Sequence, residues 1–246
     1  MPGKSAADQH IESDRAPSAA IGQAAWLAGA AIAVMPAAAQ AGFIAPSVAA
    51  YRLLFIDASG IQATSSLFSD YDTRLQTDAA FNTQLPATTW SVVASVGTAA
   101  NNSAKDHICG GPCNTTVPIY GILWNGTDYY TYLIANSLSD FFSGSVSTAP
   151  YTGLFGDNYT FYEIWTGSDA TGGALASHTL GSSDPGYGFA GSSSQYLYAD
   201  RTAPASRSYN LYGISDEILV PEPATGIAML SGGLAVLRVL RRRRRH

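Results

Sequence analysis

The C-terminal tail constrains the fold most, because two prolines separate it from the rest of the chain. Pro221 and Pro223 stop a helix from running back into the body and leave an extended segment at this point. The mostly apolar run 224–240 would form a helix about 25 Å long, slightly shorter than a hydrocarbon core of about 30 Å. A basic cluster follows, consisting of Arg241, Arg242, Arg243, Arg244 and Arg245. By the positive-inside rule this cluster stays in the cytoplasm, so we expect a transmembrane helix at 224–240 with the body facing outward.

A second apolar run, residues 24–35, lies near the N-terminus and is too short to be a stable membrane anchor. It is followed by small residues, among which Ala39 and Ala41 fit the pattern that signal peptidase recognises. We predict cleavage between Ala41 and Gly42, so that residues 1–41 are a leader and signal peptide. The leader carries three acidic and two basic residues before the run, instead of a clearly positive segment. There are two alternatives: the true start of the protein lies downstream of Met1, or the apolar run forms a buried Ala-rich helix.

The tail, residues 220–246, resembles the Pro-Glu-Pro C-terminal (PEP-CTERM) sorting domain of Gram-negative bacteria. The resemblance lies in Pro221-Glu222-Pro223, the apolar run and the arginine cluster, in that order. It implies recognition by an exosortase, a membrane-embedded cysteine protease-transpeptidase, with cleavage near Pro-Glu-Pro. It also implies transient anchoring in the inner membrane, delivery to the cell surface or the outside, and a producer of exopolysaccharide. A plain single-pass anchor is the alternative.

The body between these ends is acidic. It keeps five of the 13 basic residues but 14 of the 18 acidic ones, which gives a net charge of −9. Such a body repels phosphate backbones, so nucleic acid is not an expected partner. Hydrophobic residues make up 46% of the chain, enough for a packed core.

The two cysteines, Cys109 and Cys113, lie four residues apart in a Gly/Pro turn. In an exported protein this spacing indicates a local disulfide. A redox centre would more often use C-x-x-C, and a zinc site needs about four ligands where only His107 is adjacent. Both remain as alternatives.

The pattern of residues 42–219 predicts a small α+β domain with one early helix and short, mainly antiparallel strands joined by long loops. The helix is expected over 69–81, with Ser69 or Asp70 as its N-cap and with Tyr71, Leu75 and Phe81 on one face. Residues 101–114 and most of 167–194 are expected to be loop. Strands are expected at 51–57, 88–96, 117–124, 129–134, 159–165 and 209–218.

The order of these segments resembles an exported domain of C-type-lectin-like or endostatin-like fold. The motifs that carry the resemblance are Tyr51–Ile56, Asp70-Tyr71, Trp90–Ser95, Val117–Tyr120, Ile164–Ser168, Gly172-Gly173, Leu180-Gly181 and Leu211–Ser215. The calcium-binding motifs of sugar-binding C-type lectins, Glu-Pro-Asn or Gln-Pro-Asp with Trp-Asn-Asp, are absent from the body. The resemblance therefore implies the fold without the calcium-dependent sugar site.

No catalytic residue, cofactor or metal ligand is predicted. The body has no G-x-S-x-G, H-E-x-x-H or P-loop, and its two histidines, His107 and His178, have no serine that the sequence marks as reactive. Asp140, Asp157 and Asp169 could supply oxygen ligands to calcium, but solvated loop acids are the simpler interpretation.

These observations favour a non-enzymatic exported surface or matrix protein, associated with exopolysaccharide or a biofilm. Signal peptidase, an exosortase and the inner membrane would be its processing partners. A calcium-independent carbohydrate-binding module and a secreted hydrolase are the alternatives. Tyrosines of the later half could stack on sugars, although packing in the core is the simpler interpretation for Tyr129, Tyr130, Tyr132, Tyr151, Tyr159, Tyr162, Tyr196 and Tyr198.

Overall fold

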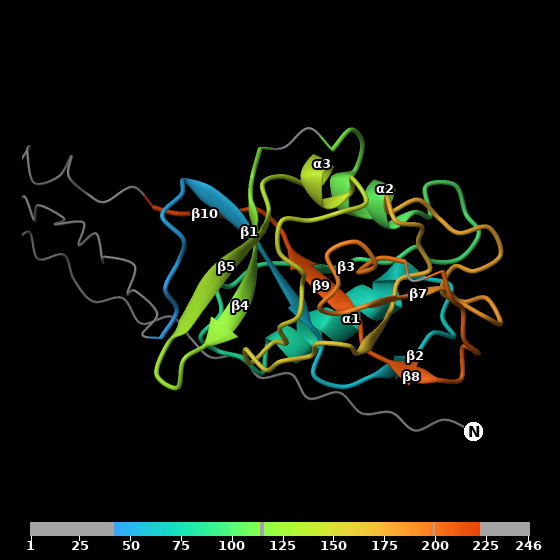
Figure 1. The fold of residues 1–246 in the computed structure, drawn as a ribbon, viewed down its shortest axis with the longest axis horizontal. Helices are drawn as coiled ribbons and strands as arrows, with labels where there is room; N and C mark the ends of the chain where they lie inside the picture. Colours follow the sequence, from blue (N-terminus) through green and yellow to red (C-terminus); the bar gives the residue numbers. More distant parts are fainter. Residues whose placement is uncertain (1–41, 114–115, 199, 222–246) are drawn as a thin grey trace, which may run out of the picture. The chain divides into compact units, whose positions relative to one another are not determined.

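The computed structural model describes residues 42–113, 116–198 and 200–221 (Figure 1). Several predictions lie outside these residues: the leader with Ala39 and Ala41, the motif residues Glu222 and Pro223, the helix 224–240 and the arginine cluster 241–245. Within the described ranges, no helix has both the length and the apolar character that crossing a bilayer requires.

A mixed six-stranded sheet organises the domain, as expected for an α+β fold (Figure 1). Five of its strands follow one another in the spatial order β3 (Trp90–Val92), β9 (Tyr212–Ser215), β1 (Ala50–Ile56), β4 (Ile119–Trp124) and β5 (Tyr129–Ala135). A sixth strand, β10 (Ile218–Leu219), pairs with the first residues of β1. Only β1 and β4 run parallel, so the sheet is mainly antiparallel.

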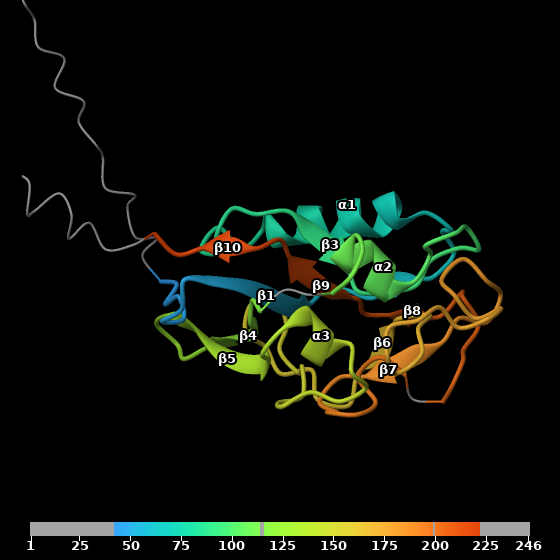
Figure 2. The same ribbon diagram turned by 90° about the horizontal axis from the view of Figure 1, so that it is seen from above.

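Strand β1 is central because its side chains fill two cores, one on each face of the sheet. Leu53 and Phe55 point into one core, and Leu54 and Ile56 into the other. Successive side chains of a strand face opposite sides, so an uninterrupted apolar run is what a strand covered on both faces needs. In Figure 2, α1 lies on one side of β1 and β9, while α3, β6 and β7 lie on the other.

Helix α1 (Phe68–Ala79) lies close to the expected range and packs against β3. Tyr71 and Leu75 are buried as predicted. Phe81 follows the end of the helix and is 72% exposed, so its expected place on the buried face was wrong. The predicted N-cap was also wrong, because Leu67 occupies that position without a side-chain hydrogen bond.

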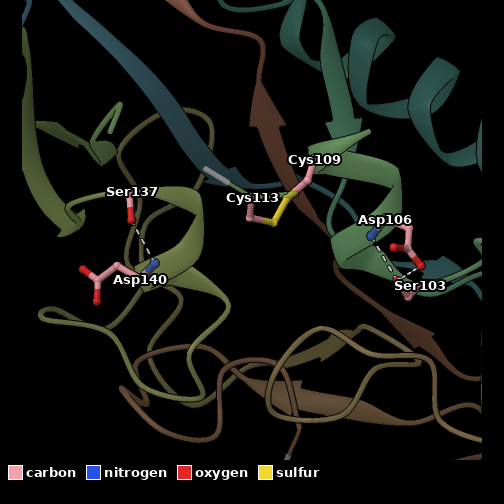
Figure 3. The surroundings of a disulfide bond; sticks show 6 residues. All are labelled: Ser103, Asp106, Cys109, Cys113, Ser137 and Asp140. Carbon is pink, nitrogen blue, oxygen red and sulfur yellow. Dashed lines mark hydrogen bonds between the residues drawn. A yellow bond between two sulfur atoms is a disulfide. The ribbon is translucent and has the colours of Figure 1, made fainter. Parts of the chain in front are cut away.

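Two further short helices, α2 (Ala104–Cys109) and α3 (Leu138–Phe141), correct the expectation of a single helix. Each is capped by a serine whose hydroxyl oxygen accepts a hydrogen bond from the backbone N–H of an aspartate three residues later (Figure 3). The pairs are Ser103 with Asp106, at 3.0 Å, and Ser137 with Asp140, at 2.9 Å. Residues 104–109 are therefore helical, not loop.

The predicted disulfide between Cys109 and Cys113 is confirmed, and it joins the last residue of α2 to the segment that follows (Figure 3). Gly110 separates the two with a left-handed φ of 61°, the usual way to end a helix. The bridge therefore fixes one turn and closes no long loop.

Two small sheets lie outside the main sheet, and long loops join their strands to the rest of the described chain. The small sheets pair β2 (Ile61–Gln62) with β8 (Ser208–Tyr209), and β6 (Glu163–Trp165) with β7 (Tyr187–Phe189). Strand β6 is shorter than the expected 159–165, β7 interrupts the expected loop, and the expected strand 209–218 is divided among β8, β9 and β10.

Candidate functional site

The most unusual exposed residue of the described chain is Phe161, just before β6. Its side chain is 82% exposed, and its backbone has a φ of 72°. This left-handed conformation is unfavourable for a bulky residue and persists only where the surroundings impose it. Here the N–H of Phe161 donates to the carbonyl of Ala190 (2.9 Å), and the N–H of Ala190 donates to the carbonyl of Tyr162 (2.9 Å). The fold thus holds a phenyl ring in solvent at a cost in backbone strain.

A hollow of about 410 Å³ opens beside this ring, and we call it the Phe161 hollow. It is lined by Phe161, Phe189, Ala190, Gly191, Ser192 and Gln195. Its volume lies in the range of about 300–1,000 Å³ that is typical of small-molecule sites. The functional groups of its lining side chains are two aromatic rings, one hydroxyl and one carboxamide. Such a set offers apolar contact with directional hydrogen bonds at one side.

The loop around residues 189–195, which lines the Phe161 hollow, is held by hydrogen bonds. The N–H of Gly191 donates to the carbonyl of Pro150 (2.9 Å), and the N–H of Gln195 donates to the hydroxyl of Ser192 (2.9 Å). The N–H of Phe189 donates to the carbonyl of Gln195 (2.9 Å). Gly191 has a φ of 78°, which glycine adopts without strain.

Buried residues pack close to β7, the strand that carries Phe189. A Cβ on Gly188 would lie 2.1 Å from the carbonyl oxygen of Tyr196, so only glycine fits in the middle of β7. Tyr196 is fully buried, and its hydroxyl donates to the carbonyl of Phe141. Burial raises the pKa of Tyr196 well above its usual range, so this hydroxyl keeps its proton. The indole N–H of Trp165 in β6 donates to the carbonyl of Ile61 (2.9 Å).

Sequence reasoning pointed to tyrosines and missed Phe161 and Phe189. Of the eight tyrosines, Tyr129 and Tyr196 are buried and Tyr162 is 51% exposed, while the other five are half-buried. Tyr162 packs edge-to-face on Tyr159, with 5.0 Å between ring centroids. Nothing in the local sequence signals a phenylalanine in the left-handed region, because hydrogen bonds to a loop about 30 residues away impose it.

A histidine–aspartate pair lies elsewhere, between α1 and α2. Nε2 of His107 is 3.1 Å from Oδ2 of Asp72, and the imidazole stacks on Phe68 with 3.8 Å between ring centroids. Asp72 also accepts a hydrogen bond from the N–H of Val92 (2.7 Å). In the described part of the chain, no serine hydroxyl is hydrogen-bonded to His107 or to His178. The pair therefore joins α1 and α2 to β3.

Two of the three loop acids considered for calcium, Asp140 and Asp169, hold turns. Asp169 accepts hydrogen bonds from the N–H groups of Thr171 (2.8 Å) and Gly173 (2.9 Å), and Asp140 accepts from the N–H of Asn136 (2.8 Å). Among the described residues, no group of three or more His, Cys, Asp or Glu side chains is arranged to hold a metal ion.

Asp57, at the end of β1, is a fully buried carboxyl group that sequence reasoning did not single out. Its Oδ1 accepts a hydrogen bond from the N–H of Leu211 (2.7 Å), whereas Oδ2 has no hydrogen-bond partner. Burial, with a smaller contribution from neighbouring Asp78, raises the pKa of Asp57 to about 7 against the lowering effects of the Leu211 and Asn210 hydrogen bonds and of Arg74.

The described end of the predicted sorting motif follows directly on the sheet. The N–H of Val220 donates to the carbonyl of Ala49 (2.9 Å), and Pro221 is exposed one residue later. At the other end, the carbonyl of Gly42 accepts from the N–H of Tyr129 (2.6 Å).

No protein-family model matches this chain, and no curated protein sequence matches it at a significant level of similarity.

Proposed function

We propose that this chain is a non-enzymatic exported protein whose domain binds polysaccharide, without calcium, at the Phe161 hollow. The observation that carries the proposal is the exposed ring of Phe161, held at a φ of 72° over a lined hollow. Strain of this kind is retained where it serves a function or where packing demands it. The ring is 82% exposed, so packing of the side chain does not account for it.

The chemistry of the Phe161 hollow suits a sugar. A pyranose has apolar C–H faces that stack on aromatic rings, and hydroxyl groups that bond to side-chain amides and hydroxyls. Phe161 and Phe189 supply the rings, and Gln195 and Ser192 supply the polar groups. Aromatic rings give large contact area at low entropy cost, which suits a shallow site on a long polymer.

Delivery is the second part of the proposal. The tail that resembles a PEP-CTERM sorting domain would hold the protein in the inner membrane until an exosortase acts near Pro221. The domain would then reach the cell surface or the exopolysaccharide outside. For the fold, we propose the C-type-lectin-like arrangement; its support is that the motifs Tyr51–Ile56 and Leu211–Ser215 form the neighbouring antiparallel strands β1 and β9.

The binding proposal is tested with the full chain in detergent micelles, by affinity electrophoresis in gels that contain plant or bacterial polysaccharides. Phe161→Gly should weaken retention about 10-fold or more, because it removes the stacking ring. Glycine accepts a φ of 72° without strain, so this variant should unfold at the wild-type temperature or above it. A loss of binding would then not come from a loss of folding.

Phe81→Ala is the matched control, because Phe81 is an exposed phenylalanine that lies at the end of α1. It should bind as the wild type does, and the chelator EDTA should change neither protein. Equal retention of the Phe161→Gly variant and the wild type would refute the site. Loss of wild-type retention in EDTA would refute the calcium-independent mode.

Sorting is tested separately, by the intact mass and location of the protein in a host that carries an exosortase. We expect a mature protein that ends near Val220 outside the cell, and a full-length protein in the membrane for the triple variant Pro221→Ala/Glu222→Ala/Pro223→Ala. A wild-type mass that still includes the arginine cluster would leave a plain membrane anchor.

A further inference from the structure

A positive charge lies next to the Phe161 hollow. The guanidinium carbon of Arg201 is 5.6 Å from the ring centroid of Phe189, one of the lining residues. The backbone of Arg201 is fixed, because its carbonyl accepts a hydrogen bond from the N–H of Tyr187 (3.3 Å). Arg201 is exposed, and its guanidinium lies against a ring that lines the hollow.

No acidic side chain of the described residues forms an ion pair with this charge. Among the five cations of the described residues, Arg74 forms an ion pair with Asp78 (3.0 Å), whereas Arg201 forms none. Asp200 precedes Arg201 in sequence, but its Oδ1 accepts a hydrogen bond from the hydroxyl of Tyr198 instead (2.9 Å). Glu163 lies opposite Phe189 in the β6–β7 pair and makes no ion pair with Arg201 either.

An arginine held on an aromatic face while its hydrogen-bonding edge stays unpaired is arranged to receive a carboxylate. The planar guanidinium bonds carboxylates in a bidentate manner, and stacking on a ring leaves the N–H groups at its edge available. A uronic acid carries a carboxylate on a pyranose ring, so it would use the ring of Phe161 and the charge of Arg201 together. We infer that the Phe161 hollow binds an acidic, uronate-bearing polysaccharide; this inference rests on the proposed polysaccharide site.

The rest of the domain is acidic, so the preference for an acidic polymer must come from contacts within the site. The body has a net charge of −9, which repels a polyanion at long range, but salt at physiological strength screens such repulsion beyond about 8 Å. A direct contact between Arg201 and a carboxylate lies well within this distance. Affinity for the acidic polymer should therefore depend on Arg201 and not on the other exposed cations.

The test compares polygalacturonate with its fully methyl-esterified form, which has the same backbone without the charge. With the full chain in micelles and EDTA present, the wild type should bind polygalacturonate about 10-fold more tightly than the ester. Arg201→Gln should abolish this ratio and leave binding of the ester unchanged. Lys105→Gln, the same change of charge at an exposed residue of α2, should keep the ratio.

The outcomes separate this inference from the proposed function. A wild-type preference for the ester, equal binding of the two polymers, or a ratio that persists in Arg201→Gln would overturn the acidic specificity. The polysaccharide site itself would stand in those cases if Phe161→Gly still loses binding of the ester. Absence of wild-type binding to both polymers would overturn the uronate inference, and the broader proposal would then depend on other polysaccharides.

Discussion

The two sides of the main sheet are built by different means. On the α1 side, one helix of 12 residues and the regular strand pairs bury the apolar side chains. On the other side, the chain between residues 136 and 211 has only short strands and one helix of four residues, yet Tyr196 and Leu197 are fully buried there. Regular secondary structure and tight packing are therefore separate properties in this domain.

Where the chain forms few strands, side-chain hydrogen bonds connect its segments. The hydroxyl of Thr166 donates to the carbonyl of Leu197, the hydroxyl of Thr179 donates to the carbonyl of Gly97 (2.8 Å), and the hydroxyls of Ser95 and Ser168 are 2.8 Å apart. These bonds are buried, where leaving a polar group unpaired is costly. The abundance of Ser and Thr thus has a structural reason.

The strongest test of this comparison removes the same side chain from each side. Leu53→Ala on the α1 side and Leu197→Ala on the loop-rich side each truncate a fully buried leucine. We expect each to lower the free energy of unfolding by about 3–5 kcal/mol, measured by chemical denaturation with a single transition. A cost below about 1 kcal/mol for Leu197→Ala would show that the loop-rich side is loosely packed.

Asp57 directly follows β1 and is hydrogen-bonded to Leu211, and its ionisation should make stability depend on pH. Its pKa is raised from 3.8 to about 7 in the folded protein, so the folded state binds the proton more tightly than the unfolded chain does. The stability that this provides is full below about pH 3.8 and is lost as the pH rises through about 7. At 1.36 kcal/mol per pKa unit, the loss approaches about 4 kcal/mol.

The variant Asp57→Asn tests this pH dependence. Its side-chain oxygen can still accept the hydrogen bond from Leu211, but it never ionises. Thermal unfolding should show it near wild-type stability at pH 4.5 and clearly more stable than the wild type at pH 8. Parallel curves for the two proteins across this range would contradict the assignment.

A smaller effect should come from glycines of the two sides. Gly167 has a φ of 56°, and a Cβ there would lie 2.6 Å from the carbonyl oxygen of Ser95 and 2.8 Å from the backbone N of Leu180. Gly126, at the tip between β4 and β5, has a φ of 95° and open space around it. Gly167→Ala should cost about 2–3 kcal/mol and Gly126→Ala about 1 kcal/mol, by thermal unfolding. Equal costs would mean that the backbone around Gly167 can shift to make room.

The same contrast decides what the sequence could predict. Strand β1 and helix α1 were placed within two residues of their observed starts and ends, because long apolar patterns dominate there. Helices α2 and α3 were missed, although Ser103 and Ser137 are each followed three residues later by an aspartate, which is a helix-capping signal. The helices are short, so no apolar periodicity accompanies that signal. The disulfide followed from the spacing of the two cysteines in a chain that we expect to be exported.

The candidate site was the least predictable part, for a physical reason. The Phe161 hollow brings Phe161 together with residues 189–195, and hydrogen bonds across that distance set the backbone of Phe161. No local pattern encodes such a contact. The expectation that aromatic residues of the loops could meet sugars stays a prediction, now directed to two phenylalanines in place of tyrosines.

The most direct test of the central claim, that the Phe161 hollow is a polysaccharide site, is amide hydrogen exchange of the full chain with and without polygalacturonate. We predict slower exchange in residues 160–163 and 189–195 when the polymer is present. Residues 79–85, around the exposed control Phe81, should exchange at the same rate in both samples. Unchanged exchange around the hollow, with protection elsewhere or nowhere at a polymer concentration that saturates binding, would contradict the claim.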